Sequence, residues 1–137
     1  MWKYYALLSA VFAGLTAILV KIGIRGIGSN LATAIRTTVV LFICWGIVFF
    51  VGELKEIKEV SRRNLLFLAL SGIATGLSWI FYFKALSTGP VSKVAVIDKL
   101  SVAIAIGLSV IILKESIDWK TITGALLIIT GTVVLIK

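Results

Sequence analysis

Histidine is absent from this 137-residue chain, and cysteine and proline each occur once. Cys44 lies within an apolar run, so no disulfide can form within one chain. Without histidine, and with a single cysteine, sites for zinc, copper or haem lack their usual ligands. A thiol catalyst at Cys44 would also lack the imidazole that commonly activates it. We therefore expect no metal, no cofactor and no thiol chemistry.

Acidic residues are scarce as well, with six Asp and Glu against 14 Lys and Arg and a formal net charge of +8. A strongly basic chain can bind nucleic acid through a basic face. Here the basic residues are scattered through short loops and the ends of apolar segments, and no soluble face remains to carry a basic stripe. The charge is typical of the flanks of membrane segments. We expect no nucleic-acid partner.

Long apolar segments dominate what is present. Hydrophobic residues make up 60% of the chain and the mean hydropathy is +1.13, whereas soluble domains contain about 45–50% apolar residues. A spanning helix needs about 20 mostly apolar residues, and backbone polar groups must be paired within lipid. The sequence therefore predicts an all-α membrane protein with five transmembrane helices. Their approximate ranges are 4–24, 31–51, 65–86, 91–113 and 121–136.

Five spans are an odd number, so the two ends of the chain are predicted to lie on opposite sides of the bilayer. Two such units, inserted upside down relative to each other, would make an inverted-repeat transporter. The spans consume nearly all of residues 1–137, so we expect one transmembrane domain forming one inverted-repeat unit. The first apolar run is longer than a signal-peptide core, and we do not expect cleavage. The predicted location is the plasma (inner) membrane.

The distribution of positive charge leaves the orientation open. We name the side that holds the N-terminus side A and the opposite side side B. Side A collects Lys3, Lys55, Lys58, Arg62, Arg63, Lys114 and Lys120, and side B collects Lys21, Arg25, Arg36, Lys84, Lys93 and Lys137. A clear bias would set the topology. In one interpretation, Arg36 and Lys84 are buried and do not count towards the charge of side B, which restores a modest preference for side A inside. In the other, the protein inserts in both orientations and two copies pair antiparallel.

Charged residues within spans are costly and mark function by default. Arg36 is about 7 Å inside its segment, and Asp98 and Lys99 are about 10–12 Å inside theirs, at about 1.5 Å per residue. Asp98 is the one acidic residue within a predicted span. These residues concentrate in the half of the membrane near side B, so we expect a polar site there.

Helical spacing groups small, polar and aromatic side chains on single faces. Three faces together are predicted to line a cavity open to side B, with aromatic walls and a mixed-charge mouth. They are Asp98, Ser101, Ala105 and Ser109 in the fourth segment, Ala10, Gly14, Ala17 and Lys21 in the first, and Thr75, Trp79 and Tyr82 in the third.

Two interpretations of Asp98 remain open at this point. The carboxylate either pairs with Arg36 or Lys84 and never titrates, or it exchanges a proton or a cationic substrate, with a pKa set by its burial and nearby cations. Lys99 is rotated by about 100° from Asp98. It either extends its amine towards side B or faces the cavity and attracts an anion.

Several motifs, in order and spacing, resemble the EamA domain of the drug/metabolite transporter superfamily. Arg36 matches a position where that family carries arginine. The other matching stretches are Tyr82-Phe83-Lys84-Ala85-Leu86 with Gly89-Pro90-Val91-Ser92, Leu113-Lys114-Glu115, and Gly124-Ala125-Leu126-Leu127-Ile128 with Gly131. The resemblance covers essentially the whole chain.

This resemblance implies a transporter of small metabolites. Full-length members carry two five-helix repeats in inverted orientation, so a homodimer is the economical way to supply a second repeat here. Smaller drug-exporting relatives use a membrane glutamate in their first helix, whereas this first segment offers Lys21. Proton-coupled drug export is therefore not expected.

The resulting prediction is a homodimeric secondary transporter of small polar or amphipathic metabolites that works by alternating access in the lipid bilayer. The predicted substrate-binding residues are Asp98, Lys99, Arg36, Trp79, Tyr82 and Ser101. One alternative is a flippase subunit for a lipid-linked sugar, and another is a non-transporting membrane subunit. An enzyme is the least supported class, because no metal ligands and no nucleophile–base pair are present.

Overall fold

The computed structural model describes residues 1–136; Lys137, which the sequence analysis assigned to side B, lies outside them. The described chain is α-helical, and five of its segments are long and apolar enough to cross a membrane. The prediction of an all-α membrane protein with five spanning helices is therefore confirmed. The helices are α1 (Trp2–Gly23), α2 (Ser29–Val51), η1 (Glu53–Glu59), α3 (Arg62–Thr88), α4 (Val91–Asp98), α5 (Leu100–Leu113) and α6 (Trp119–Ile136).

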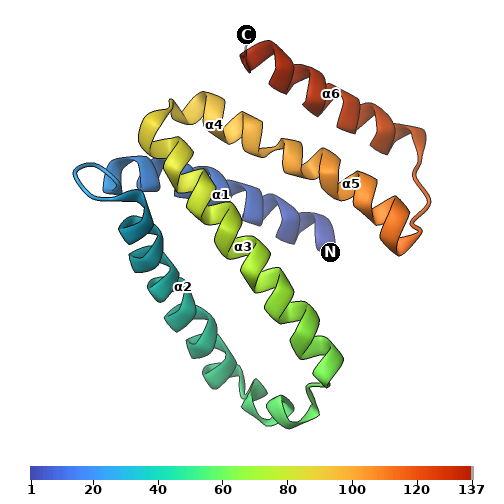
Figure 1. Cartoon of the computed structure of the whole chain (residues 1–137). Helices are drawn as coiled ribbons and strands as arrows, with labels where there is room; N and C mark the ends of the chain where they lie inside the picture. Colours follow the sequence, from blue (N-terminus) through green and yellow to red (C-terminus); the bar gives the residue numbers. More distant parts are fainter. Residues whose placement is uncertain (137) are drawn as a thin grey trace. The chain divides into compact units, whose positions relative to one another are not determined.

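The structure divides into two compact units, Met1–Ser87 and a second unit that begins at Thr88. The first contains α1, α2, η1 and α3. In Figure 1, α2 and α3 run antiparallel and are joined through the short 3₁₀ helix η1. All residues of η1 are exposed.

The second unit contains α4, α5 and α6. Both α4 and α5 contact α6, which returns antiparallel beside them (Figure 1). The fourth predicted span occupies 91–113 as expected, but it is made of two helices separated by Lys99. The break was not predicted, because no glycine or proline lies at this point of the sequence.

Local chemistry sets the helix ends. Gly52 ends α2 with a φ of 86°, a left-handed conformation that glycine adopts without a steric penalty. Lys114 adopts a φ of 54° after α5, and the N–H of Glu115 bonds back to the carbonyl of Ser109 at 3.3 Å. This bond is typical of a left-handed helix C-cap. Asp118 caps the start of α6 by accepting the N–H of Thr121 at 3.0 Å.

Four of the five spanning helices are longer than predicted, and for α3 and α6 the added residues at the start belong to polar flanks. The range 65–86 becomes Arg62–Thr88, and 121–136 becomes Trp119–Ile136. Ser61 Oγ accepts the N–H of Asn64 at 3.1 Å and so starts α3 among charged residues. A count of apolar residues predicts the part of a helix that crosses the lipid. It does not include the polar residues of the first and last turns, which also belong to the helix.

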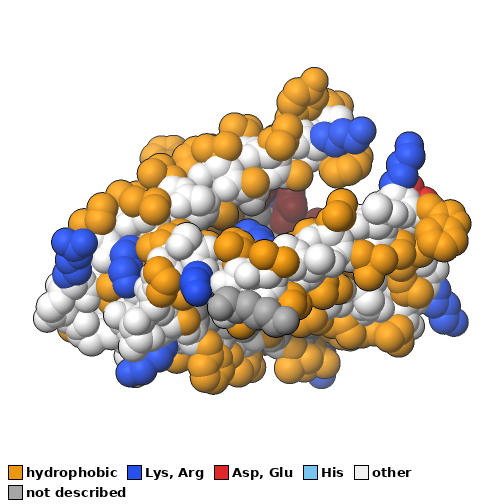
Figure 2. All heavy atoms as spheres, turned by 90° about the horizontal axis from the view of Figure 1, so that it is seen from above, with side chains coloured by type: hydrophobic (Ala, Val, Ile, Leu, Met, Phe, Trp, Pro, Cys, Tyr) orange, Lys and Arg blue, Asp and Glu red, His pale blue; other side chains and the backbone are white. Residues whose placement is uncertain are grey.

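Most large apolar side chains are exposed, and the buried hydrophobic residues among those described are Ala17, Val20, Ile24, Phe83 and Leu86. Figure 2 shows hydrophobic side chains spread over most of the visible face. A soluble monomer rarely exposes apolar patches of this extent. In a bilayer these side chains contact lipid, while the helices pair their own backbone groups. The chain is an integral membrane protein.

Candidate functional site

Arg36 lies in α2, seven residues after its first residue Ser29, which places it about 10 Å along the helix axis. Its guanidinium lies over the ring of Trp79, with 4.3 Å between the guanidinium carbon and the ring centroid, and 5.6 Å from the centroid of Phe83. Trp79 and Phe83 are four residues apart, so they share one face of α3. Two aromatic rings from α3 therefore hold one cation of α2 by cation–π contact.

Within the first unit, Met1–Ser87, the guanidinium has no carboxylate partner. Nor does the guanidinium donate a hydrogen bond to another group of the first unit. Tyr82, half-buried beside Phe83, is close enough to interact with Arg36 electrostatically. A guanidinium carries five N–H donors. A carboxylate would accept hydrogen bonds from these donors, whereas the aromatic rings stack on the guanidinium and do not accept them in this way. Within the first unit no acidic side chain engages these donors.

A cavity of about 430 Å³ lies beside this cluster. Its walls come from α1, the turn after it, α2 and one residue of α3. The lining residues are Thr16, Leu19, Val20, Gly23, Ile24, Ile27, Ala32, Ile35, Arg36 and Phe83. Two of them, Thr16 and Arg36, carry polar side chains, and Arg36 is the one charged residue of this lining. The hydroxyl of Thr16 already donates to the carbonyl of Phe12 at 2.8 Å. The cavity is therefore an apolar cleft with one cationic end.

The face of α1 that lines this cleft differs from the one predicted. The expected set was Ala10, Gly14, Ala17 and Lys21, whereas α1 contributes Thr16, Leu19, Val20 and Gly23. Ala17 is instead buried in the core, and Lys21 extends its amine to the backbone carbonyl of Leu86, with 2.5 Å between the two atoms. Leu86 lies in the last turn of α3, where helix carbonyls lack partners within the helix. Lys21 therefore caps α3.

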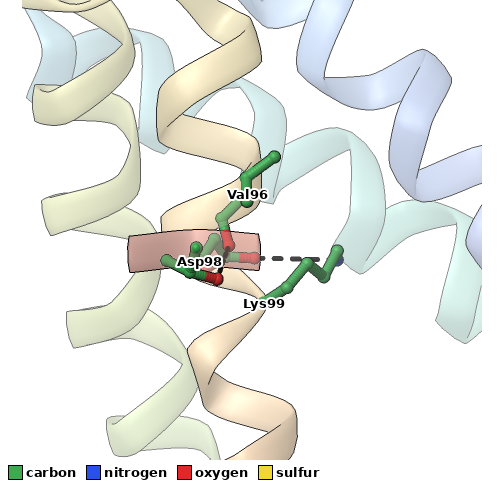
Figure 3. A network of polar contacts seen from close by, with 4 residues as sticks. Val96, Asp98 and Lys99 are labelled. Atoms are coloured by element: carbon green, nitrogen blue, oxygen red, sulfur yellow. Dashed lines mark hydrogen bonds and ion pairs between the residues drawn. The ribbon is translucent and has the colours of Figure 1, made fainter. Parts of the chain in front are cut away.

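Asp98 and Lys99 occupy the break between α4 and α5 (Figure 3). Asp98 Oδ2 and Lys99 Nζ are 3.8 Å apart, and the two side chains remain 38% and 57% exposed. Within the second unit, the ion-pair partner of Asp98 is its neighbour in sequence. Pairing with Arg36 or Lys84, one of the two interpretations of Asp98, stays a prediction. An ion pair this exposed stabilises the fold little, so both groups can still exchange partners.

Thr132 of α6 supplies a physical reason for the break. It is fully buried, and its hydroxyl lies 2.8 Å from the carbonyl of Ile128 and 3.4 Å from that of Val96. In a regular helix the Val96 carbonyl would accept the N–H four residues later. Here it accepts the N–H of Lys99, three residues later, at 3.0 Å. A side chain that inserts into the hydrogen-bond ladder is a recognised cause of helix kinks.

The six predicted site residues fall into two groups. Arg36, Trp79 and Tyr82 come together in the first unit, while Asp98, Lys99 and the exposed Ser101 lie along α4 and α5 in the second. Their roles in substrate binding stay predictions. Sequence reasoning missed Phe83 and Thr132. Phe83 lies one turn after Trp79, which is a usable signal; nothing in the sequence singled out Thr132.

Among residues 1–136, no three His, Cys, Asp or Glu side chains lie close enough together to hold a metal ion. The one cysteine, Cys44, is exposed on α2. The site chemistry is that of charged and aromatic side chains.

Comparison with known proteins identifies the family. The family model described as "EamA-like transporter family" matches residues 1–137. A protein from Sinorhizobium sp named "Uncharacterized transporter in cobO 3'region" is 42% identical over 134 residues, which cover 98% of this chain and 95% of that protein. No solved structure gives a significant match. The chain therefore belongs to the EamA-like transporter family, and it is a membrane transporter.

Proposed function

We propose that this protein is a secondary transporter of small polar or amphipathic metabolites, and that it works by alternating access as an antiparallel homodimer. The observation that carries the proposal is the single unit of five candidate spans in a chain of a transporter family. Alternating access in many secondary transporters relies on two repeats of opposite orientation that move against each other. A second copy inserted upside down would supply the missing repeat.

The relative from Sinorhizobium supports a single-repeat transporter. The alignment covers 95% of that protein, so it has room for about as many helices as the present chain. The near balance of positive charge on the two predicted sides also supports insertion in both orientations, because charge bias normally sets topology.

Each unit offers polar groups that could contact a substrate. In the first unit, a cavity lies directly beside Arg36 and its aromatic partners. In the second unit, the Asp98–Lys99 pair lies at a helix break. Discontinuous helices near the membrane midplane commonly carry the substrate and ion sites of transporters.

Topology tests the homodimer. Single cysteines replace the exposed residues Lys55 of η1 and Arg25 of the α1–α2 turn, in a Cys44→Ser background, and intact cells are labelled from each side. Comparable labelling of both positions from both sides is the expected result. Labelling of each position from one side alone would contradict antiparallel insertion and would point to a different inverted partner.

Transport is tested in proteoliposomes loaded with candidate metabolites, with counterflow as the readout. Asp98→Asn is expected to abolish exchange while the purified protein stays monodisperse and helical. Normal counterflow by this variant would remove Asp98 from the pathway. Movement of a lipid-linked sugar in place of soluble metabolites would indicate a flippase subunit. The absence of flux with any substrate would indicate a non-transporting subunit.

A further inference from the structure

We propose that the cleft lined by α1, α2 and Phe83 binds an amphipathic anion, whose carboxylate or phosphate head pairs with the Arg36 guanidinium while its apolar body lies in the cleft. This inference rests on the proposed transport function and specifies the substrate class of the same site. It concerns the first unit alone.

The charge balance around Arg36 calls for an anion. A cation within a membrane span is costly unless it is paired or solvated. Within the first unit, Met1–Ser87, the guanidinium is stacked on Trp79 and Phe83 and has no carboxylate within ion-pair distance. Cation–π contact offsets part of the cost and leaves the edge of the guanidinium available. A ligand anion would complete the pairing.

The residue type favours a carboxylate or a phosphate. A guanidinium presents a planar fork of donors that binds two oxygens of such a group at once, whereas an ammonium acts as a point charge. No Asp or Glu lines the cavity, so nothing in the lining would attract a cation or compete for Arg36.

The remaining walls favour an apolar body. Leucine, isoleucine, valine and phenylalanine side chains form most of the lining, and the hydroxyl of Thr16 is occupied by its own helix. A volume of about 430 Å³ falls within the range of about 300–1,000 Å³ common for small-molecule sites. A sugar or another polyhydroxylated body would find almost no hydrogen-bond partner along these walls.

A quenching experiment tests the head group. Trp79 is kept as the one tryptophan by replacing Trp2, Trp45 and Trp119 with phenylalanine, and the full chain is placed in nanodiscs of phosphatidylcholine at high salt. Its fluorescence is titrated with octyl chains brominated beside a carboxylate, an alcohol or a trimethylammonium head. We expect saturable quenching by the carboxylate alone, displaced by octanoate and not by octanol. Equal quenching by all three heads would overturn the proposal.

A pair of variants tests the residue. Arg36→Gln is expected to weaken carboxylate binding about tenfold or more, the loss expected for a charge-assisted hydrogen bond. Arg63→Gln is the matched control, because Arg63 also lies over an aromatic ring, 5.9 Å from the centroid of Phe67, and does not line the cavity. Unchanged affinity in a monodisperse Arg36→Gln protein would overturn the proposal. The octanoate-against-octanol competition needs no change at Arg36 and keeps the test valid if that variant fails to fold.

A lipid head group and a free metabolite carry the same anionic chemistry, and the lipid composition separates them. If a lipid is the occupant, phosphatidylglycerol nanodiscs should lower the affinity for the brominated carboxylate, and native mass spectrometry should find lipid retained by the wild type and lost from Arg36→Gln. If a free metabolite is the occupant, the affinity should not depend on the lipid. Either result supports an anion site.

The outcome is separable from that of the proposed function. Carboxylate binding without flux in proteoliposomes would refute transport and leave the anion site standing. Flux that is indifferent to the substrate head group and to Arg36 would refute the anion site and leave transport standing.

Discussion

Arg36 in α2 and the Asp98–Lys99 pair between α4 and α5 both place charge within a membrane-length segment, but their surroundings differ. Arg36 is held by two aromatic rings beside an apolar cleft. Asp98 and Lys99 pair with each other at a helix break and remain partly exposed. The cation of the first arrangement has no carboxylate partner in its own unit, whereas the charges of the second form an ion pair with each other. Charged side chains in the membrane segments of one chain can therefore be stabilised in two different ways, by aromatic rings or by an ion pair.

The largest effect expected within the first region comes from removing its charge. Arg36→Gln should lower counterflow about tenfold or more, because a charge-assisted contact with substrate is lost. Its thermal unfolding temperature should stay the same or rise, since the variant removes a charge that has no carboxylate partner in its own unit. Counterflow in proteoliposomes and circular dichroism check the two expectations. Lost stability together with retained transport would assign Arg36 to the fold and not to the site.

The next effect sharpens the role of Lys21 as a structural cation in the same region. Lys21→Met should lower the free energy of unfolding by about 1–3 kcal/mol, because the carbonyl of Leu86 loses its donor. Lys93→Met, at an exposed position of α4, is the control and should change little. Thermal or denaturant unfolding in detergent micelles measures both. An equal loss of unfolding free energy in the two variants would show that the destabilisation comes from the lost charge and not from the lost cap.

A smaller effect tests the origin of the break in the second region. Thr132→Val keeps the shape and removes the hydroxyl near the Val96 carbonyl, at a cost of about 1 kcal/mol. The freed carbonyl should then accept the N–H of Leu100 as in a regular helix, and hydrogen exchange at that amide should slow. Thr123→Val is the control, because that exposed hydroxyl donates to Trp119 within the same helix. Unchanged exchange at Leu100 would exclude Thr132 as the cause of the break.

The smallest expected effect concerns Asp118, outside the spans. Hydrogen bonds from the side chain and the backbone of Thr121 lower the pKa of Asp118 below its ordinary value of 3.8. A lowered pKa in the folded state gives stability that is present above the ordinary pKa and is lost as the pH falls through the lowered one. Stability should therefore decline below about pH 3.8. Asp118→Asn keeps a capping side chain without titrating and should show a shallower decline; an identical decline would exclude Asp118.

Much of the fold and part of the site could be predicted. Runs of apolar residues of membrane length predicted all five spans, because lipid leaves the backbone no partner outside the helix. Helical spacing placed Trp79 and Tyr82 on one side of α3, and both lie near Arg36 in the structure. Phe83 was missed because an aromatic residue in an apolar segment resembles its lipid-facing neighbours until its contacts are known.

The sequence by itself determined the number of spans, the membrane location and the presence of a few charges within them, since these follow from local composition and hydration. The tertiary structure decided what those charges contact. Lys21 reaches a carbonyl 65 residues away, and the carbonyl of Val96 meets a hydroxyl 36 residues away. It also decided which face of α1 lines the cleft. Such pairings depend on how helices approach one another, and helical periodicity, which relates residues within one helix, contains no information about that approach.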